Sequence, residues 1–204
     1  MLGVVLAAGA GRRMGTPKGL LAAAGGGSWA ARAAHALAAG GCDPVLVTVG
    51  ASGDRVAATL PAGVGAVPVA DWDRGPGAGV AAALEHATSL RRGGSGGPDL
   101  VVLTLVDLPG VDAALVAEVV AAAAGDTAHA LVRAVDGDRP GHPVALGRAH
   151  WSRALRVCAD GSGLRALFAA PDLAAHVVRV QHPASVRDAD RPEDLPGHGA
   201  PGRA

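Results

Sequence analysis

The first eleven residues limit what this chain can fold into more than any other stretch. Residues 3–7 (Gly-Val-Val-Leu-Ala) form a short apolar run, which is typical of a buried strand. The run ends in Ala8-Gly9-Ala10-Gly11, where small residues let backbone N–H groups approach a ligand closely. A strand that passes directly into such a turn predicts an α/β protein with a ligand site at the end of its first strand.

Cations follow this turn within the same loop, at Arg12, Arg13 and Lys18. Lys18 is the only lysine of the chain, against seventeen arginines. A lysine kept in such a composition indicates that a compact ammonium charge is needed there, not a planar guanidinium. Backbone N–H dipoles and positive charges that face one anion form a phosphate cradle. The alternative is a surface lysine in a loop.

Three kinds of phosphate-binding loop can be compared with this one. A P-loop needs Ser or Thr after its lysine, whereas Lys18 is followed by Gly19. A dinucleotide-binding loop needs a third glycine and an acidic residue about twenty positions on, but the first acidic residue after the loop is Asp43. A triphosphate needs more positive charge, which this loop supplies. The loop therefore favours a nucleoside triphosphate.

Apolar runs alternate with segments of helical composition along the rest of the chain, which predicts a largely parallel sheet. We expect one domain over residues 1–195, followed by a disordered tail at 196–204. Residues 136–142 are interpreted as a polar turn. Besides the first strand, strands are expected at 45–49, 65–70, 100–106, 129–135 and 176–180, and helices at 28–39, 52–60, 77–92, 112–124 and from about 148.

Composition excludes several classes of protein. The formal net charge is zero, so nothing points to nucleic acid or to an acidic membrane surface as a partner. No apolar run approaches the length of a membrane span, and the apolar N-terminus lacks the basic region of a signal peptide. Cys42 and Cys158 are expected to be reduced packing residues. We therefore predict a soluble, cytoplasmic protein.

An acidic residue follows the most apolar expected strand, in Leu105-Val106-Asp107-Leu108-Pro109. A carboxylate at the carboxyl end of a buried strand is well placed to hold Mg²⁺ against a triphosphate. Asp107 could instead be a turn residue or a helix cap, but Asp112 is the better candidate for the cap. We therefore favour a metal role for Asp107.

The first loop as a whole resembles the signature of the MobA-like nucleotidyltransferases. The resemblance rests on Leu6-Ala7-Ala8-Gly9-x-Gly11-x-Arg13-Met14-Gly15-x-Pro17-Lys18-x-Leu20-Leu21, and further matching motifs extend to residue 195. It implies the nucleotidyltransferase (Rossmann-like) version of a three-layer α/β sandwich. It also implies attack of an anionic acceptor on the α-phosphorus of a nucleoside triphosphate, with release of pyrophosphate.

The resemblance assigns roles to particular residues. Asp107-Leu108-Pro109 matches the family's D-x-P, whose aspartate holds magnesium, and Asp190 opens a D-x-P-E-D-L match that implies a second metal ligand. His142 lies in a G-H-P match on the acceptor side. Without the resemblance, Asp190 belongs to a solvated charge run and His142 to a turn. The implied catalytic residues are Arg13, Lys18 and Asp107, and the implied nucleotide-binding residues are Leu6, Ala7, Ala8, Gly9, Gly11, Arg13, Lys18, Asp71 and Gly79.

The motifs point to more than one nucleotide and more than one acceptor. Leu-Ala-Ala-Gly at residues 6–9 and the two later motifs resemble molybdenum cofactor cytidylyltransferases, which predicts transfer from CTP to a pterin-type phosphate acceptor. Lys18-Gly19-Leu20 and Gly75-Pro76-x-Ala78-Gly79 resemble the guanylyl side, so GTP is the alternative, as is another small phosphate acceptor. A molybdoenzyme or its chaperone is a possible protein partner. Other classes left open are a non-catalytic nucleotide-binding or chaperone-like subunit and an NAD-dependent oxidoreductase.

Overall fold

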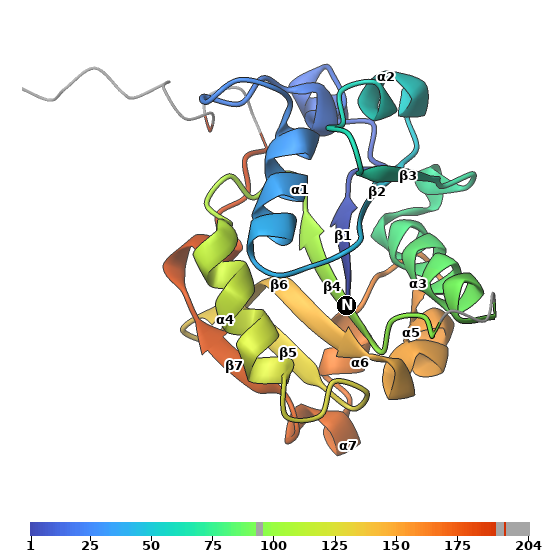
Figure 1. The fold of residues 1–204 in the computed structure, drawn as a ribbon, viewed down its shortest axis with the longest axis vertical. Coiled ribbons are helices and arrows are strands. Elements are labelled where there is room, and N and C mark those ends of the chain that lie inside the picture. The colour runs from blue at the N-terminus through green and yellow to red at the C-terminus, as the bar shows by residue number, and fades with distance from the viewer. Residues whose placement is uncertain (93–95, 191–193, 195–204) are drawn as a thin grey trace, which may run out of the picture.

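A seven-stranded sheet forms the centre of the protein, with strand order β3-β2-β1-β4-β6-β5-β7 (Figure 1). The computed structural model describes residues 1–92, 96–190 and 194. Only β6 runs antiparallel to its neighbours in this sheet, so the predicted mostly parallel α/β sheet is confirmed. The strands are β1 (Leu2–Leu6), β2 (Val45–Val49), β3 (Gly65–Pro68), β4 (Leu100–Leu105), β5 (Leu131–Asp136), β6 (Arg139–Gly147) and β7 (Val178–Gln181).

Helices cover both faces of the sheet and complete the three predicted layers. On one face lie α1 (Trp29–Ala39) and α4 (Ala113–Ala123), with the short α2 (Gly53–Ala57). On the other face lie α3 (Pro76–Arg92), α5 (Trp151–Cys158) and α6 (Arg165–Phe168). Outside these layers, α7 (Pro171–Ala174) precedes β7. Short 3₁₀ turns are η1 (Arg12–Met14), η2 (Lys18–Leu20), η3 (Trp72–Arg74), η4 (Arg148–His150) and η5 (Pro183–Val186).

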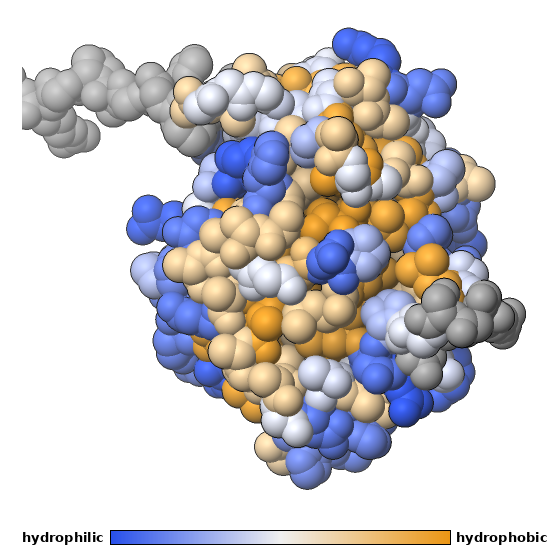
Figure 2. Space-filling model, viewed as in Figure 1, coloured by the Kyte–Doolittle hydropathy of each residue, from blue (hydrophilic) through white to orange (hydrophobic). Residues whose placement is uncertain are grey.

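Small residues build much of the core, since the chain has a single Phe. Val and Leu side chains of β1, β2 and β4 point to both helical layers, where alanines of α1 and α3 meet them. A Cβ on Gly40 would lie 2.4 Å from Val116, so only glycine lets the end of α1 approach α4 this closely. Cys42 and Cys158 are buried and free, as expected for packing residues. Figure 2 shows hydrophilic residues around the rim of the face seen in Figure 1 and hydrophobic residues over much of its centre, interrupted there by a few hydrophilic side chains.

The strand β6 contradicts the interpretation of residues 136–142 as a turn. Pro140, Gly141 and Pro143 are typical of turns, yet all three lie within the strand. A Cβ on Gly141 would lie 2.4 Å from the carbonyl oxygen of Ser185, so the segment of η5 that packs here requires glycine. The prediction was wrong because this contact is made with residues more than forty positions away. As a result, His142 lies inside the sheet, next to β4.

The parallel strands bring three chain segments to one edge of the sheet. Leu6 pairs with Thr48 on one side and with Leu105 on the other, so the loops that leave β1, β2 and β4 begin side by side. This is the edge at which α/β proteins bind ligands. None of the helices in the described part of the chain is long and apolar enough to cross a membrane. The tail predicted at 196–204 lies outside the described residues.

Candidate active site

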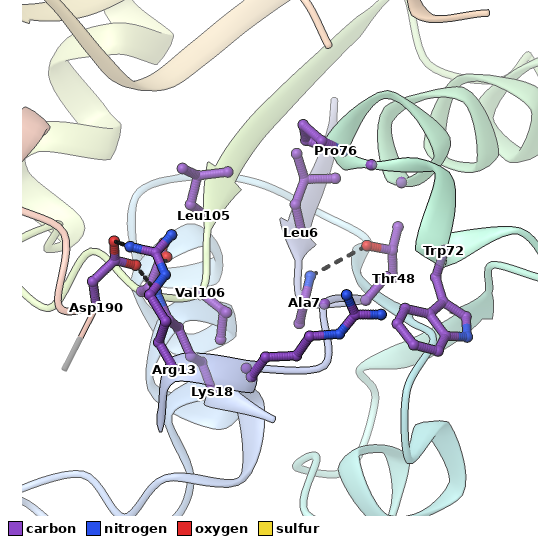
Figure 3. A pocket seen from close by; sticks show the side chains of 17 residues that line it. Leu6, Ala7, Arg13, Lys18, Thr48, Trp72, Pro76, Leu105, Val106 and Asp190 are labelled. Carbon is purple, nitrogen blue, oxygen red and sulfur yellow. Dashed lines mark hydrogen bonds and ion pairs between the residues drawn. The ribbon is translucent and has the colours of Figure 1, made fainter. Parts of the chain in front are cut away.

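A cavity of about 600 Å³ opens at the carboxyl ends of β1, β2 and β4 (Figure 3). Its size is that of a ligand pocket. The first loop forms one wall, and the starts of η3 and α3 form another. Among its lining residues are eight of the nine predicted nucleotide-binding residues and both predicted metal ligands: Leu6, Ala7, Ala8, Gly9, Gly11, Arg13, Lys18, Gly79, Asp107 and Asp190.

The glycine turn after β1 is fixed by its own backbone and by β2. Gly11 has φ +60°, and a Cβ there would lie 1.9 Å from the carbonyl oxygen of Thr16, so no other residue fits. The Ala7 N–H donates to the carbonyl oxygen of Thr48 at 3.2 Å and contacts its Oγ1 at 3.3 Å. The Ala51 N–H donates to the carbonyl oxygen of Ala8 at 3.0 Å. The loop is therefore held in place before any ligand arrives.

The ammonium group of Lys18 lies between two carboxylates at the edge of the cavity. Its Nζ is 2.7 Å from Asp107 Oδ2 and 2.6 Å from Asp190 Oδ1. The other oxygen of Asp190 accepts a hydrogen bond from Arg13, as Figure 3 shows. The Lys18 side chain is only 15% exposed and that of Asp107 20%, whereas Arg13 is 71% exposed. Lys18 and Asp107 therefore form the sheltered part of the cluster, and Arg13 its rim.

These contacts favour the charged forms of the groups. Burial by itself lowers the pKa of Lys18, but its hydrogen bonds and ion pairs with Asp107 and Asp190 act in the opposite direction and raise that pKa overall. The hydrogen bond from Lys18 lowers the pKa of Asp190, and the charge of Arg13 adds to the effect. The ammonium group consequently stays protonated at neutral pH.

A backbone hydrogen bond places the second carboxylate. The Ala189 N–H donates to the carbonyl oxygen of Asp107 at 2.9 Å, which fixes Asp190 next to the end of β4. The Asp190 N–H in turn donates to Asp194 Oδ2 at 3.0 Å. Two acidic residues far apart in the sequence thus face one point in the cavity.

The two carboxylates fit a magnesium ion that arrives with phosphate. Within the described residues, no group of three His, Cys, Asp or Glu side chains is close enough to hold a metal ion alone. Mg²⁺ is commonly held by one or two carboxylates together with substrate phosphates and water. Asp107 and Asp190 already converge on a cation, the Lys18 ammonium. The donor set therefore suits a shared metal–phosphate site, and magnesium remains a prediction.

Asp71 lies away from the first cavity. Its carboxylate pairs with Arg74 at 2.9 Å and lines a second cavity, of about 540 Å³, on the α5 side of η3. Its neighbour Trp72 lines the first cavity instead. Trp72, which the sequence analysis did not single out, is thus a wall of the candidate site. The signal available in the sequence was its place at the carboxyl end of the third strand.

His142 lies on the other half of the sheet, beyond Asp107. Its Nδ1 faces the carbonyl oxygen of Leu103 at 3.4 Å. The pKa of His142 is lowered to about 4, chiefly by burial and also by the charge of Arg133, while the Leu103 carbonyl and Asp107 oppose the shift. The guanidinium carbon of Arg133 lies 4.5 Å from the ring centroid of Phe168. The Arg133 side chain forms no ion pair within the described part of the chain. Sequence reasoning did not find Arg133.

A glycine turn and three cations after the first strand of a mostly parallel sheet are the arrangement of an α/β nucleotide-binding protein. Residues 3–180 match the MobA-like NTP transferase domain. The chain therefore belongs to this family, as the resemblance of its first loop implied.

The chain is also similar to individual proteins. A protein of Rhodopirellula baltica named probable molybdenum cofactor guanylyltransferase is 35% identical over 109 residues, which are 53% of this chain and 49% of the relative. The chain thus spans about half the length of this curated relative. The solved structure of a homologue of Mycobacterium tuberculosis Rv0371c, from Mycobacterium sp. strain JC1, is 27% identical with a TM-score of 0.70 and covers 95% of this chain and 91% of its own.

The fold is also that of a nucleotidyl transferase from Methanothermobacter. That structure is 20% identical to this chain, has a TM-score of 0.73 and covers 95% of this chain and 93% of its own.

The lowered pKa of His142 makes stability depend on pH. Between its ordinary value of about 6.5 and the folded value of about 4, the unfolded chain binds a proton at this ring that the folded protein excludes. The free energy of unfolding should therefore fall as pH falls through this range. His142→Gln should reduce this pH dependence, measured by urea unfolding between pH 7 and pH 4. His35→Gln, which removes an exposed histidine of α1, is the control. Equal slopes for the wild type and His142→Gln would contradict this assignment.

Proposed function

We propose that the protein transfers GMP from GTP to a molybdenum cofactor pterin, with release of pyrophosphate. The observation that carries the proposal is the cluster of Lys18, Asp107 and Asp190 at one end of the cavity. The guanylyltransferase name of the Rhodopirellula baltica relative supports GTP, as do Lys18-Gly19-Leu20 and the loop at 75–79. The name of this relative does not support the CTP preference predicted from Leu-Ala-Ala-Gly at residues 6–9 and the two later motifs.

The shape of the cavity suits the proposed substrate. Figure 3 shows Trp72 and Thr48 on one side of the cavity and Asp190 on the other, with Arg13 and Lys18 next to Asp190. We place the base near Trp72, whose ring offers an apolar face, and the triphosphate along the glycine turn toward Lys18. The anionic end of the nucleotide then meets the positive charges, and the base meets the apolar wall.

The reaction depends on positioning of the two substrates and on positive charge near the phosphates more than on proton transfer. An oxygen of the acceptor's phosphate attacks the α-phosphorus, and the bond from that phosphorus to the bridging oxygen breaks as the new bond forms. Pyrophosphate leaves with the electron pair. Because the attacking oxygen is already anionic, no general base is required. Arg13 and Lys18 stabilise the negative charge that develops on the leaving group.

Asp107 and Asp190 would hold a magnesium ion, which supplies charge neutralisation at the phosphate oxygens. Without nucleotide, Lys18 gives these two carboxylates the positive charge they need. The same ammonium group lines one cavity with the glycine turn, so Lys18 can also serve the triphosphate. Lys18 is therefore a cation with two sets of anionic partners, the carboxylates and the phosphates.

The acceptor would bind on the half of the sheet that carries His142 and Arg133. A neutral imidazole can donate and accept hydrogen bonds, and its lowered pKa keeps His142 neutral at pH 7. Arg133 adds a positive charge that no described carboxylate neutralises. An anionic pterin phosphate that lies here would face the α-phosphate across Asp107.

Removal of Lys18 should change both the turnover number and the effect of Mg²⁺ on the melting temperature. We expect Lys18→Ala to lower kcat by about 10²–10³-fold, the usual cost of losing one positioned charge. Lys18→Arg should fail to restore the full rate, because a guanidinium does not fit where a compact ammonium group lies between two carboxylates. Without Lys18, Asp107 and Asp190 repel each other, so added Mg²⁺ should raise the Tm of Lys18→Ala more than that of the wild type.

Pyrophosphate release and thermal unfolding with and without Mg²⁺ measure these effects. Arg13→Ala, which leaves Lys18 between the carboxylates, is the control for the Mg²⁺-dependent change in Tm. Full activity of Lys18→Arg would contradict the need for an ammonium group.

The choice of nucleotide is tested by kcat/KM for GTP and CTP with molybdopterin cofactor as the acceptor. We expect the wild type to prefer GTP. Ala8→Gly should shift the ratio further toward GTP, because loss of a methyl group from the cavity wall leaves more room for a purine; such size effects amount to about 1–3 kcal/mol. Ala10→Gly changes the same loop outside the cavity lining and is the matched control. A wild-type preference for CTP would overturn the guanylyl proposal and leave the nucleotidyltransferase class intact.

A further inference from the structure

Arg32 on α1 holds the loop that carries Asp107. Its guanidinium donates to the carbonyl oxygens of Leu108 at 2.8 Å, Pro109 at 2.9 Å and Val111 at 3.2 Å. Hydrogen bonds from a charged donor are stronger than neutral ones, and the planar fork fixes their directions. One side chain thus fixes the backbone directly after Asp107.

The helix that carries Arg32 also supports the turn that carries Lys18. The Trp29 N–H donates to the carbonyl oxygen of Leu21 at 2.8 Å. A Cβ on Gly19 would lie 3.7 Å from that of Ala30, so η2 packs against the first turn of α1. Both partners of the Lys18–Asp107 ion pair therefore rest on neighbouring turns of one helix.

A purely structural role explains Arg32 poorly. The side chain is half-buried, and its Nε has no hydrogen-bond partner within the described residues. Burial of a guanidinium without a described carboxylate partner costs free energy, and it lowers the pKa of Arg32. The retained guanidinium is directed at three carbonyl groups of one loop, and that loop begins at Asp107.

We propose that Arg32 is a positioning residue, which fixes the loop at 107–111 so that the Asp107 carboxylate points at Lys18 and at the cation of the reaction. The first half of this statement concerns the nucleotide-free protein alone, and the second half rests on the proposed function. Arg32 touches no reacting atom, since it acts through the carbonyl groups of the loop.

The single lysine offers a direct test. In protein labelled with ¹⁵N-lysine, an ammonium group sheltered between carboxylates should give a persistent side-chain NH₃⁺ signal, whereas rapid exchange with water broadens that of an exposed lysine. Arg32→Met and Arg32→Gln should weaken or abolish this signal at a pH where the wild type shows it. Arg153→Met, which removes another half-buried arginine, on α5 and paired with Asp172, should leave the signal unchanged.

A persistent, unchanged signal in the Arg32 variants would overturn the proposal, and so would a failure of both variants to fold, because Arg32 would then be a structural residue. No nucleotide, metal or acceptor is used, so this result does not depend on the proposed function. In turnover with GTP and molybdopterin cofactor, Arg32→Gln should lower kcat by about 10–100-fold and raise the Mg²⁺ requirement, as loss of a residue behind a metal ligand usually does. The KM for GTP should stay unchanged, and a rise in that KM alone would also count against the proposal.

Discussion

The ammonium group of Lys18 is the contact on which the candidate site depends. It joins three segments that are far apart in the sequence: the loop after β1, the end of β4 and the residues around Asp190. Two facing carboxylates without a cation would repel each other at this sheltered position. The short bonds to Asp107 and Asp190 show how the protein solves this in the absence of nucleotide, and they mark the point to which a further cation would be attracted.

The fold makes this contact possible by simple means. Parallel pairing of β1 with β4 puts the ends of both strands at one edge, and the register of Leu6 with Leu105 brings their loops together. Helix α1 then supports both loops, through the packing of η2 and through Arg32. Trp72 and Thr48 line the cavity at the same edge.

Sequence patterns predicted those features that depend on local chemistry. Apolar runs, glycines and the lone lysine were enough for the sheet, the first loop and the place of Asp107. Asp190 came only from the family resemblance, because nothing local distinguishes it from its acidic neighbours. The prediction of a turn at 136–142 was wrong because Pro140, Gly141 and Pro143 have turn propensities. The pairing of β6 with β4 and β5 and the contact with Ser185 override these propensities. Arg32 acts through contacts between distant segments, which no local pattern reports.

The most direct test of this account is a crystal structure with a non-hydrolysable GTP analogue and Mn²⁺. We expect an anomalous difference peak between the carboxylates of Asp107 and Asp190, with the Lys18 ammonium moved from between them to the phosphates. The base should lie beside Trp72. A structure in which the nucleotide is bound and Lys18 still bridges Asp107 and Asp190, with Mn²⁺ held elsewhere, would contradict the central claim.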